Sequence, residues 1–121
     1  MPRRVLIIED NPLMAAELTA LCADAGFSTA GPARDVAGAR SLIETARPDI
    51  LIVDVNLQGP GRGYDLCTDE VTRGRIVVFS TGDPASVPKD LAARWPILKK
   101  PYEREAIVRV LDACREQLDA G

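Results

Sequence analysis

The hydrophobic positions of the chain fall into short continuous runs that are separated by longer stretches with helical spacing. Four runs are typical of strands: residues 4–8 (RVLII), 50–53 (ILIV), 76–79 (IVVF) and 97–99 (ILK). A weaker run at residues 28–30 completes a set of five. Continuous apolar runs are typical of parallel strands that are covered on both faces of a sheet.

The stretches between these runs predict helices. The first helix should begin after Asn11, a good N-cap, with Pro12 at its first position, and end at Gly26. A second helix should begin after Asp35 and end near Arg47. Further helices are expected at residues 64–71, within the poorly patterned residues 84–95, and along the last stretch, where residues 107, 110, 111, 114 and 118 share one apolar stripe.

Alternating strands and helices predict an α/β fold in which a five-stranded parallel sheet is doubly wound by helices. With the strand order 2-1-3-4-5, the winding reverses between the first and third strands, and ligands bind there, at the carboxyl ends of the strands. A chain of 121 residues has room for one domain, which we expect to span residues 1–121.

The residues that end or follow these strands carry the candidate chemistry. Glu9 and Asp10 follow the first strand, Asp54 the third, Thr81 the fourth and Lys100 the fifth. Three carboxylates at one edge repel one another, and Mg²⁺, which prefers oxygen ligands, would balance them. With the metal bound, Asp54 can attack phosphorus as a nucleophile. The ammonium of Lys100 and the hydroxyl of Thr81 would stabilise the transferring phosphoryl oxygens.

Each of these residues alone has a simpler explanation. Glu9 and Asp10 can favour the N-terminus of the following helix, Thr81 can be a turn residue, and Lys100 can be a solvated strand end. Their joint placement at one edge favours the functional interpretation. The glycine-rich residues 58–63 (QGPGRG) lack the Lys-Ser or Lys-Thr pair of a phosphate-binding loop and are expected to form a flexible turn.

Composition argues against several other classes of protein. The net charge of −3 and the absence of histidine disfavour a broad nucleic-acid surface, a histidine triad and most zinc sites. The apolar runs are far shorter than the roughly 20 residues of a membrane span, and the N-terminus lacks the apolar core of a signal peptide. We therefore expect a cytoplasmic protein with neither nucleic acid nor membrane as a partner, and its three cysteines are expected to pack in the core.

Four motifs in order along the chain resemble the receiver domain of bacterial two-component response regulators, which has a flavodoxin-like, CheY-like fold. Residues 5–11 (VLIIEDN) resemble its acidic opening and residues 50–57 (ILIVDVNL) its acceptor strand. Residues 77–82 (VVFSTG) resemble its strand ending in a hydroxyl, and residues 98–102 (LKKPY) its lysine followed by proline. The resemblance extends from residue 3 to about residue 118.

This resemblance implies roles for particular residues. Asp54 would be the phosphorylation site, Asp10 a direct Mg²⁺ ligand and Glu9 a water-mediated one. Asn56 would ligate the metal through its backbone carbonyl. The Thr81 hydroxyl and the Lys100 ammonium would contact the phosphoryl oxygens, as proposed above. The Lys100–Pro101 peptide would be cis, a form that is realistically open only before proline.

Two departures from the family pattern are visible. Receivers often carry an aromatic residue three positions before the lysine, and here that position holds Ile97. Residues 79–83 (FSTGD) partly resemble the receiver subgroup named for a Phe-Ala-Thr-Gly motif, but Ser80 replaces the alanine and Asp83 stands where an aromatic is expected.

The resemblance implies a stand-alone receiver that accepts a phosphoryl group on Asp54 from a histidine kinase or phosphotransfer protein. It would catalyse only its own phosphorylation and dephosphorylation and would signal to a downstream protein target through altered contacts. The alternative is a pseudo-receiver, a protein-interaction module that is never phosphorylated.

Two enzyme-like or cofactor-binding classes fit less well. A flavodoxin-like carrier would need a phosphate-binding loop where this chain has the acidic residues 9–12 (EDNP). A phosphatase of the haloacid dehalogenase type would need a second aspartate two positions after the nucleophile, where this chain has Asn56. Neither FMN binding nor turnover of external substrates is therefore expected.

Overall fold

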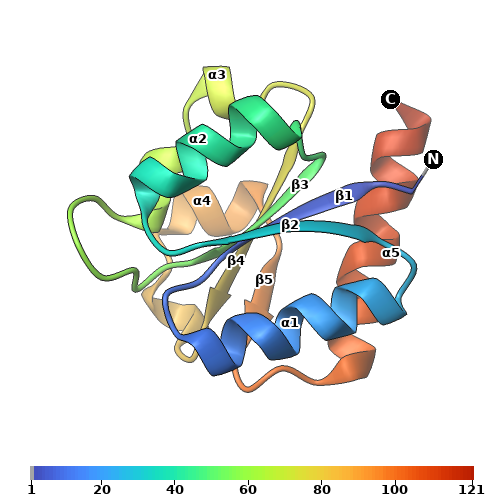
Figure 1. Cartoon of the computed structure of the whole chain (residues 1–121), viewed down its shortest axis with the longest axis horizontal. Coiled ribbons are helices and arrows are strands. Elements are labelled where there is room, and N and C mark those ends of the chain that lie inside the picture. The colour runs from blue at the N-terminus through green and yellow to red at the C-terminus, as the bar shows by residue number, and fades with distance from the viewer. Residues whose placement is uncertain (1) are drawn as a thin grey trace.

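A five-stranded parallel sheet forms the centre of the molecule (Figure 1). The structure, a computed structural model, describes residues 2–121. The strands lie in the order β2-β1-β3-β4-β5, and all neighbours are parallel, which confirms the predicted fold. Their bounds are β1 (Arg4–Ile8), β2 (Ser28–Ala33), β3 (Ile50–Asp54), β4 (Ile76–Thr81) and β5 (Ile97–Lys99).

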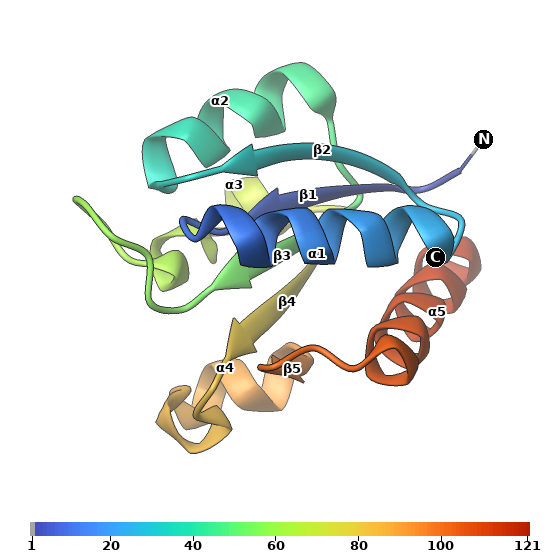
Figure 2. The same ribbon diagram turned by 60° about the horizontal axis from the view of Figure 1, so that its bottom comes forward.

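Helices cover both faces of this sheet (Figure 2). The helices α1 (Pro12–Asp24) and α5 (Arg104–Ala120) lie on one face and contact each other. The opposite face is covered by α2 (Val36–Ala46), α3 (Asp69–Thr72) and α4 (Lys89–Arg94). This double cover explains why the sequence of the central strands is almost continuously apolar.

The core is built on β1, β3 and β4. The apolar side chains of these strands are at most 3% exposed, and only Arg4, at the start of β1, is exposed. Burying one such side chain contributes about 1.5–3 kcal/mol to folding, so these strands are the most firmly held part of the chain. Their carboxyl ends are therefore fixed points on which a site can be built.

Side-chain caps fix where the chain turns after β1 and β2. The Asn11 carboxamide oxygen accepts the backbone N–H of Leu13 at 3.0 Å and of Met14 at 3.2 Å. The Asp35 carboxylate accepts the backbone N–H of Gly38 at 2.7 Å. Both predicted N-caps are confirmed, and the first of them directly follows the acidic residues at the end of β1.

Two predicted elements differ from the structure. Strand β2 continues to Ala33 because it stays paired with β1 across a register irregularity, so it is longer than the predicted residues 28–30. The helix predicted at residues 64–71 is instead a 3₁₀ turn, η1 (Gly63–Leu66), followed by α3. Thr68 separates the two, because its hydroxyl caps α3 by accepting the N–H of Val71.

The cysteines behave as core residues, as predicted for the helical ones. Cys22 and Cys114 are buried, and Cys67 is partly buried. Burial raises the pKa of the Cys22 thiol to about 12 and that of Cys114 to about 11. Because the thiolate is the reactive form, these two thiols are inert near neutral pH.

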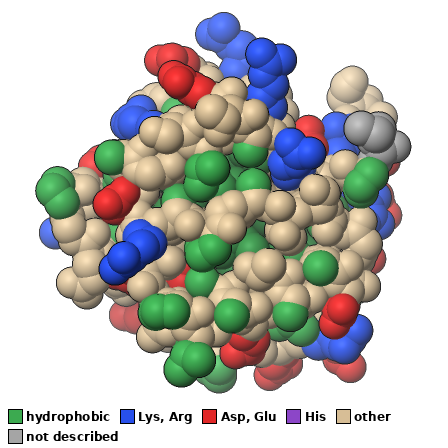
Figure 3. Space-filling view, viewed as in Figure 1, with side chains coloured by type: hydrophobic (Ala, Val, Ile, Leu, Met, Phe, Trp, Pro, Cys, Tyr) green, Lys and Arg blue, Asp and Glu red, His purple; other side chains and the backbone are tan. Residues whose placement is uncertain are grey.

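The surface in Figure 3 shows basic and acidic side chains interspersed among neutral ones. Within residues 2–121, no helix has both the length and the apolar character that crossing a bilayer requires.

Candidate functional site

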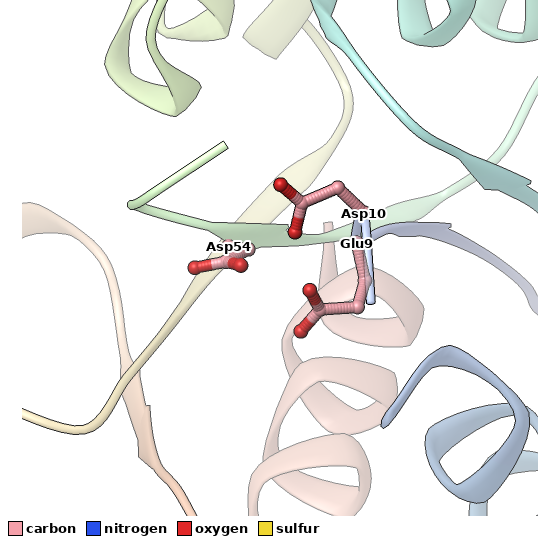
Figure 4. Close-up of side chains that lie close together, drawn as sticks. All are labelled: Glu9, Asp10 and Asp54. Atoms are coloured by element: carbon pink, nitrogen blue, oxygen red, sulfur yellow. The ribbon is translucent and has the colours of Figure 1, made fainter. Parts of the chain in front are cut away.

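Three carboxylates meet at the carboxyl edge of the sheet (Figure 4). Glu9 and Asp10 follow β1, and Asp54 ends β3. The pairing of Ile8 with Val53 aligns the ends of the two strands. Each residue offers a carboxylate oxygen, and the three oxygens lie within 4.8 Å of one another.

The ammonium of Lys100 lies between two of these carboxylates. Its Nζ is 2.8 Å from Glu9 Oε1 and 3.1 Å from Asp54 Oδ2. All three side chains are largely removed from water, with exposures of 16%, 2% and 6% for Lys100, Glu9 and Asp54. The neighbouring Lys99 is exposed, so Lys100 is the lysine that enters the site. The Lys100–Pro101 peptide is cis, as the resemblance implies.

The protonation equilibria of this ion pair are perturbed. Burial raises the pKa of the Glu9 carboxyl, and the hydrogen bonds from Lys100 and the Asn11 backbone offset only part of that rise, to which Asp54 adds. Burial acts to lower the pKa of Lys100, but its interactions with Glu9, Tyr102 and Asp54 together outweigh burial and raise it. The ammonium is therefore charged at neutral pH, and Glu9 keeps its proton to a higher pH than an exposed glutamate does.

The raised pKa of Glu9 predicts a pH dependence of stability. Folded Glu9 binds a proton more tightly than unfolded Glu9, so its contribution to the free energy of unfolding increases as the pH falls through the raised pKa towards the ordinary value of 4.5. With a metal chelator present, the unfolding free energy of the wild type minus that of Glu9→Gln should increase in urea titrations as the pH is lowered towards 4.5. A difference that stays flat would contradict the assignment.

Backbone N–H groups orient the three carboxylates. Asn56 donates to Asp54 Oδ1 at 2.9 Å, Gln58 to Asp10 Oδ2 at 2.8 Å, and Asn11 donates to Glu9 Oε2 at 3.1 Å. The loop after β3 is thereby tied to both acidic strand ends. These hydrogen bonds hold the carboxylate oxygens in place.

Gly63 brings the glycine-rich loop back against β3. A Cβ at this position would lie 2.6 Å from the backbone oxygen of Asp54 and 2.7 Å from Val53 Cγ1. Both neighbours belong to a buried strand that cannot easily move. The end of residues 58–63 is therefore a packed crossing point, whereas the sequence predicted a flexible turn.

Replacing Gly63 with alanine should therefore destabilise the fold. We expect the free energy of unfolding to fall by about 2–3 kcal/mol, because overpacking against backbone forces β3 or the loop to shift. Gly82→Ala is the matched control, because a Cβ on Gly82 would meet no atom within 4 Å. Urea unfolding compares the two, and equal stabilities would contradict the close approach.

Thr81 and its neighbour Ser80 end β4 beside Asp54. Both are 1% exposed, and Ser80 is the residue paired with Asp54 in the sheet. The Thr81 hydroxyl oxygen accepts the N–H of Asp83 at 3.0 Å. The Ser80 hydroxyl lies 2.6 Å from that of Tyr102, a contact that the sequence did not predict.

The donor set at this edge fits a hard divalent cation. When ionised, the three carboxylates and Lys100 leave two negative charges uncompensated, all on oxygen atoms that lie close together. Carboxylate oxygens are the side-chain ligands that Mg²⁺ prefers. The predicted carbonyl ligand, Asn56, lies in the adjoining loop, where its N–H already holds Asp54.

Comparisons with known proteins agree with this fold. The family description "Response regulator receiver domain" matches residues 5–112. The transcriptional regulatory protein PdtaR of Mycobacterium tuberculosis is 30% identical over 118 residues, which cover 93% of this chain and 56% of PdtaR. The chain belongs to the response regulator receiver family, a class of two-component signalling modules. It spans little more than half the length of that relative.

Solved structures show the same fold. The receiver domain of PhyR from Erythrobacter litoralis superimposes with a TM-score of 0.84 at 24% identity, covering 95% of this chain and 91% of that domain. A putative response regulator from Chloroflexus aurantiacus gives a TM-score of 0.80 at 29% identity, with coverages of 94% and 98%. These likenesses extend over nearly the whole chain.

Proposed function

We propose that this receiver accepts a phosphoryl group on Asp54 from a histidine kinase or phosphotransfer protein. The observation that carries the proposal is the position of Asp54 at a rigid strand end, beside two further carboxylates and in contact with the Lys100 ammonium. Neither an electron carrier nor a purely structural strand end explains this combination. The protein would be phosphorylated and dephosphorylated by its own site and would act on no external substrate.

The reaction is a transfer in which one bond to phosphorus replaces another. A carboxylate oxygen of Asp54 attacks phosphorus and forms an acyl phosphate, while the bond from phosphorus to the donor's nitrogen or oxygen breaks and its electron pair leaves with the donor. Lys100 is within reach of Asp54 and would stabilise the negative phosphoryl oxygens. The Thr81 hydroxyl would donate its hydrogen to the same oxygens, while its oxygen can still accept the N–H of Asp83.

The acidic residues would hold Mg²⁺. Asp10 and Asp54 would be direct ligands, Glu9 would act through water, and Asn56 would contribute its backbone carbonyl. The metal would supply positive charge that offsets repulsion between the carboxylate and the incoming phosphoryl group. The chain's own part is to hold these oxygens in place through the backbone hydrogen bonds of Asn11, Asn56 and Gln58.

The phosphorylated form would signal by changed contacts with a downstream protein. We propose a single cytoplasmic receiver domain over residues 1–121, with neither membrane nor nucleic acid as its direct partner. One observation favours the alternative of a pseudo-receiver: Lys100 also pairs with Glu9, so part of the acidic charge is balanced within the chain.

Labelling by a small phosphodonor distinguishes the two functions. Incubation with acetyl phosphate and Mg²⁺ should add one phosphoryl group in intact-protein mass spectra, and a chelator should prevent the addition. The label should be stable in acid but released by hydroxylamine, as expected of an acyl phosphate. A protein that is not labelled, or that is labelled equally with and without the chelator, would favour the pseudo-receiver.

A further inference from the structure

The turn that carries Lys100 is held to β4 at two successive residues. At the first, the backbone N–H of Lys100 donates to the carbonyl of Thr81 at 2.9 Å. At the second, the hydroxyls of Ser80 and Tyr102 form a buried hydrogen bond of 2.6 Å. The Lys100 side chain leaves this turn and reaches Glu9 and Asp54.

Ser80 connects this turn to the acceptor strand. It is paired with Asp54 in the sheet, and its carbonyl accepts the N–H of Val55 at 3.2 Å. Its hydroxyl meets that of Tyr102, so one residue of β4 contacts both the strand that ends in Asp54 and the turn that presents Lys100. The positions of Asp54 and of Lys100 therefore both depend on contacts with Ser80.

The two hydroxyls depend on each other. Ser80 is 1% exposed and Tyr102 is 8% exposed. Within residues 2–121, neither hydroxyl has another side-chain hydrogen bond. A buried hydroxyl that loses its partner costs free energy, so the pair holds the turn in one place rather than leaving it free to move.

We propose that the Ser80–Tyr102 hydroxyl pair positions the Lys100 ammonium against Asp54 and thereby sets the rate at which Asp54 is phosphorylated. This inference rests on the proposed function and adds two positioning residues to it. Neither hydroxyl touches the phosphoryl group. Both act through the turn, because a small displacement of a transition-state contact is enough to slow a transfer.

Three variants test the proposal: Tyr102→Phe, Ser80→Ala and the double variant. At saturating acetyl phosphate and Mg²⁺, each should be labelled about fivefold more slowly than the wild type, because a displaced Lys100 ammonium would lose about 1 kcal/mol of its stabilisation of the transition state. Ser80→Thr keeps a hydroxyl and should restore most of the rate.

The stabilities of the variants distinguish positioning of Lys100 from the alternative that the two buried hydroxyls only satisfy each other's hydrogen bonds. Each single variant leaves one hydroxyl buried without its partner, whereas the double variant removes both, so it should regain stability in urea titrations. Its labelling should nevertheless remain slow. A double variant that regains both stability and rate, or folded single variants that are labelled within about twofold of the wild type, would overturn the proposal.

A readout that does not need phosphorylation keeps this test apart from that of the proposed function. The NMR signals of the Lys100 ammonium and its adjacent methylene report the position of the side chain in the unphosphorylated protein. They should shift in Tyr102→Phe while those of Lys99 do not, and an unchanged Lys100 signal would contradict positioning. An unlabelled wild type would count against the proposed function alone.

Discussion

Replacing Asp54 with asparagine should abolish labelling by acetyl phosphate while the fold is retained. An amide oxygen carries no formal negative charge and is a far poorer nucleophile toward phosphorus than a carboxylate. The asparagine carbonyl oxygen can still accept the N–H of Asn56, which now bonds Asp54 Oδ1. Mass spectrometry after incubation with acetyl phosphate and Mg²⁺ measures the loss, and circular dichroism checks the fold.

Two other acidic residues serve as controls for this variant. Asp83 is exposed and follows the neighbouring strand β4, so Asp83→Asn should be labelled as fast as the wild type. Asp10→Asn should be labelled, but only at a higher Mg²⁺ concentration, because it removes a metal ligand rather than the acceptor. A phosphoryl group that persists in Asp54→Asn would show that another residue is the acceptor.

The sequence predicted the sheet well because each central strand is buried on both faces. Runs such as residues 50–53 have no polar position that would allow another register or another element. Strand order then places the ends of β1 and β3 side by side. The meeting of Glu9, Asp10 and Asp54 follows from these two facts, without any knowledge of loops.

The short helices were less predictable, for a physical reason. A segment of four to eight residues cannot be stable as an isolated helix, so its form depends on tertiary contacts and caps. Residues 64–71 have helical spacing, yet the Thr68 hydroxyl starts a new helix by accepting the N–H of Val71. That competition between local caps is not visible in the apolar pattern.

Contacts between loops and the strands that they cross could not be predicted from the sequence either. The packing of Gly63 against the Asp54 carbonyl and the hydroxyl pair of Ser80 and Tyr102 both depend on where loops cross the sheet edge. A signal was present for Tyr102, because a hydroxyl-bearing aromatic directly after Lys-Pro at a strand end is poorly explained by packing alone. Its partner could be found only with the register of β4.

Replacing Lys100 with alanine should slow labelling of Asp54 by about 10- to 100-fold, the range expected when a charge-assisted hydrogen bond of about 1.5–3 kcal/mol is lost from the transition state. The ammonium lies 3.1 Å from Asp54 Oδ2, so it is close to where the phosphoryl oxygens would arrive. The variant should also be less stable at neutral pH, because Glu9 loses its cation at 2.8 Å while remaining buried.

Lys99→Ala is the matched control for this prediction, because it removes the same charge one residue away. Lys99 is exposed and, within residues 2–121, forms no ion pair, so its loss should leave the labelling rate within about twofold of the wild type. Rates at saturating acetyl phosphate and Mg²⁺ compare the two variants, and urea titrations compare their stabilities. Equal losses of rate would mean that general positive charge near the site matters, rather than the ammonium held between Glu9 and Asp54, and the assignment of Lys100 would then be wrong.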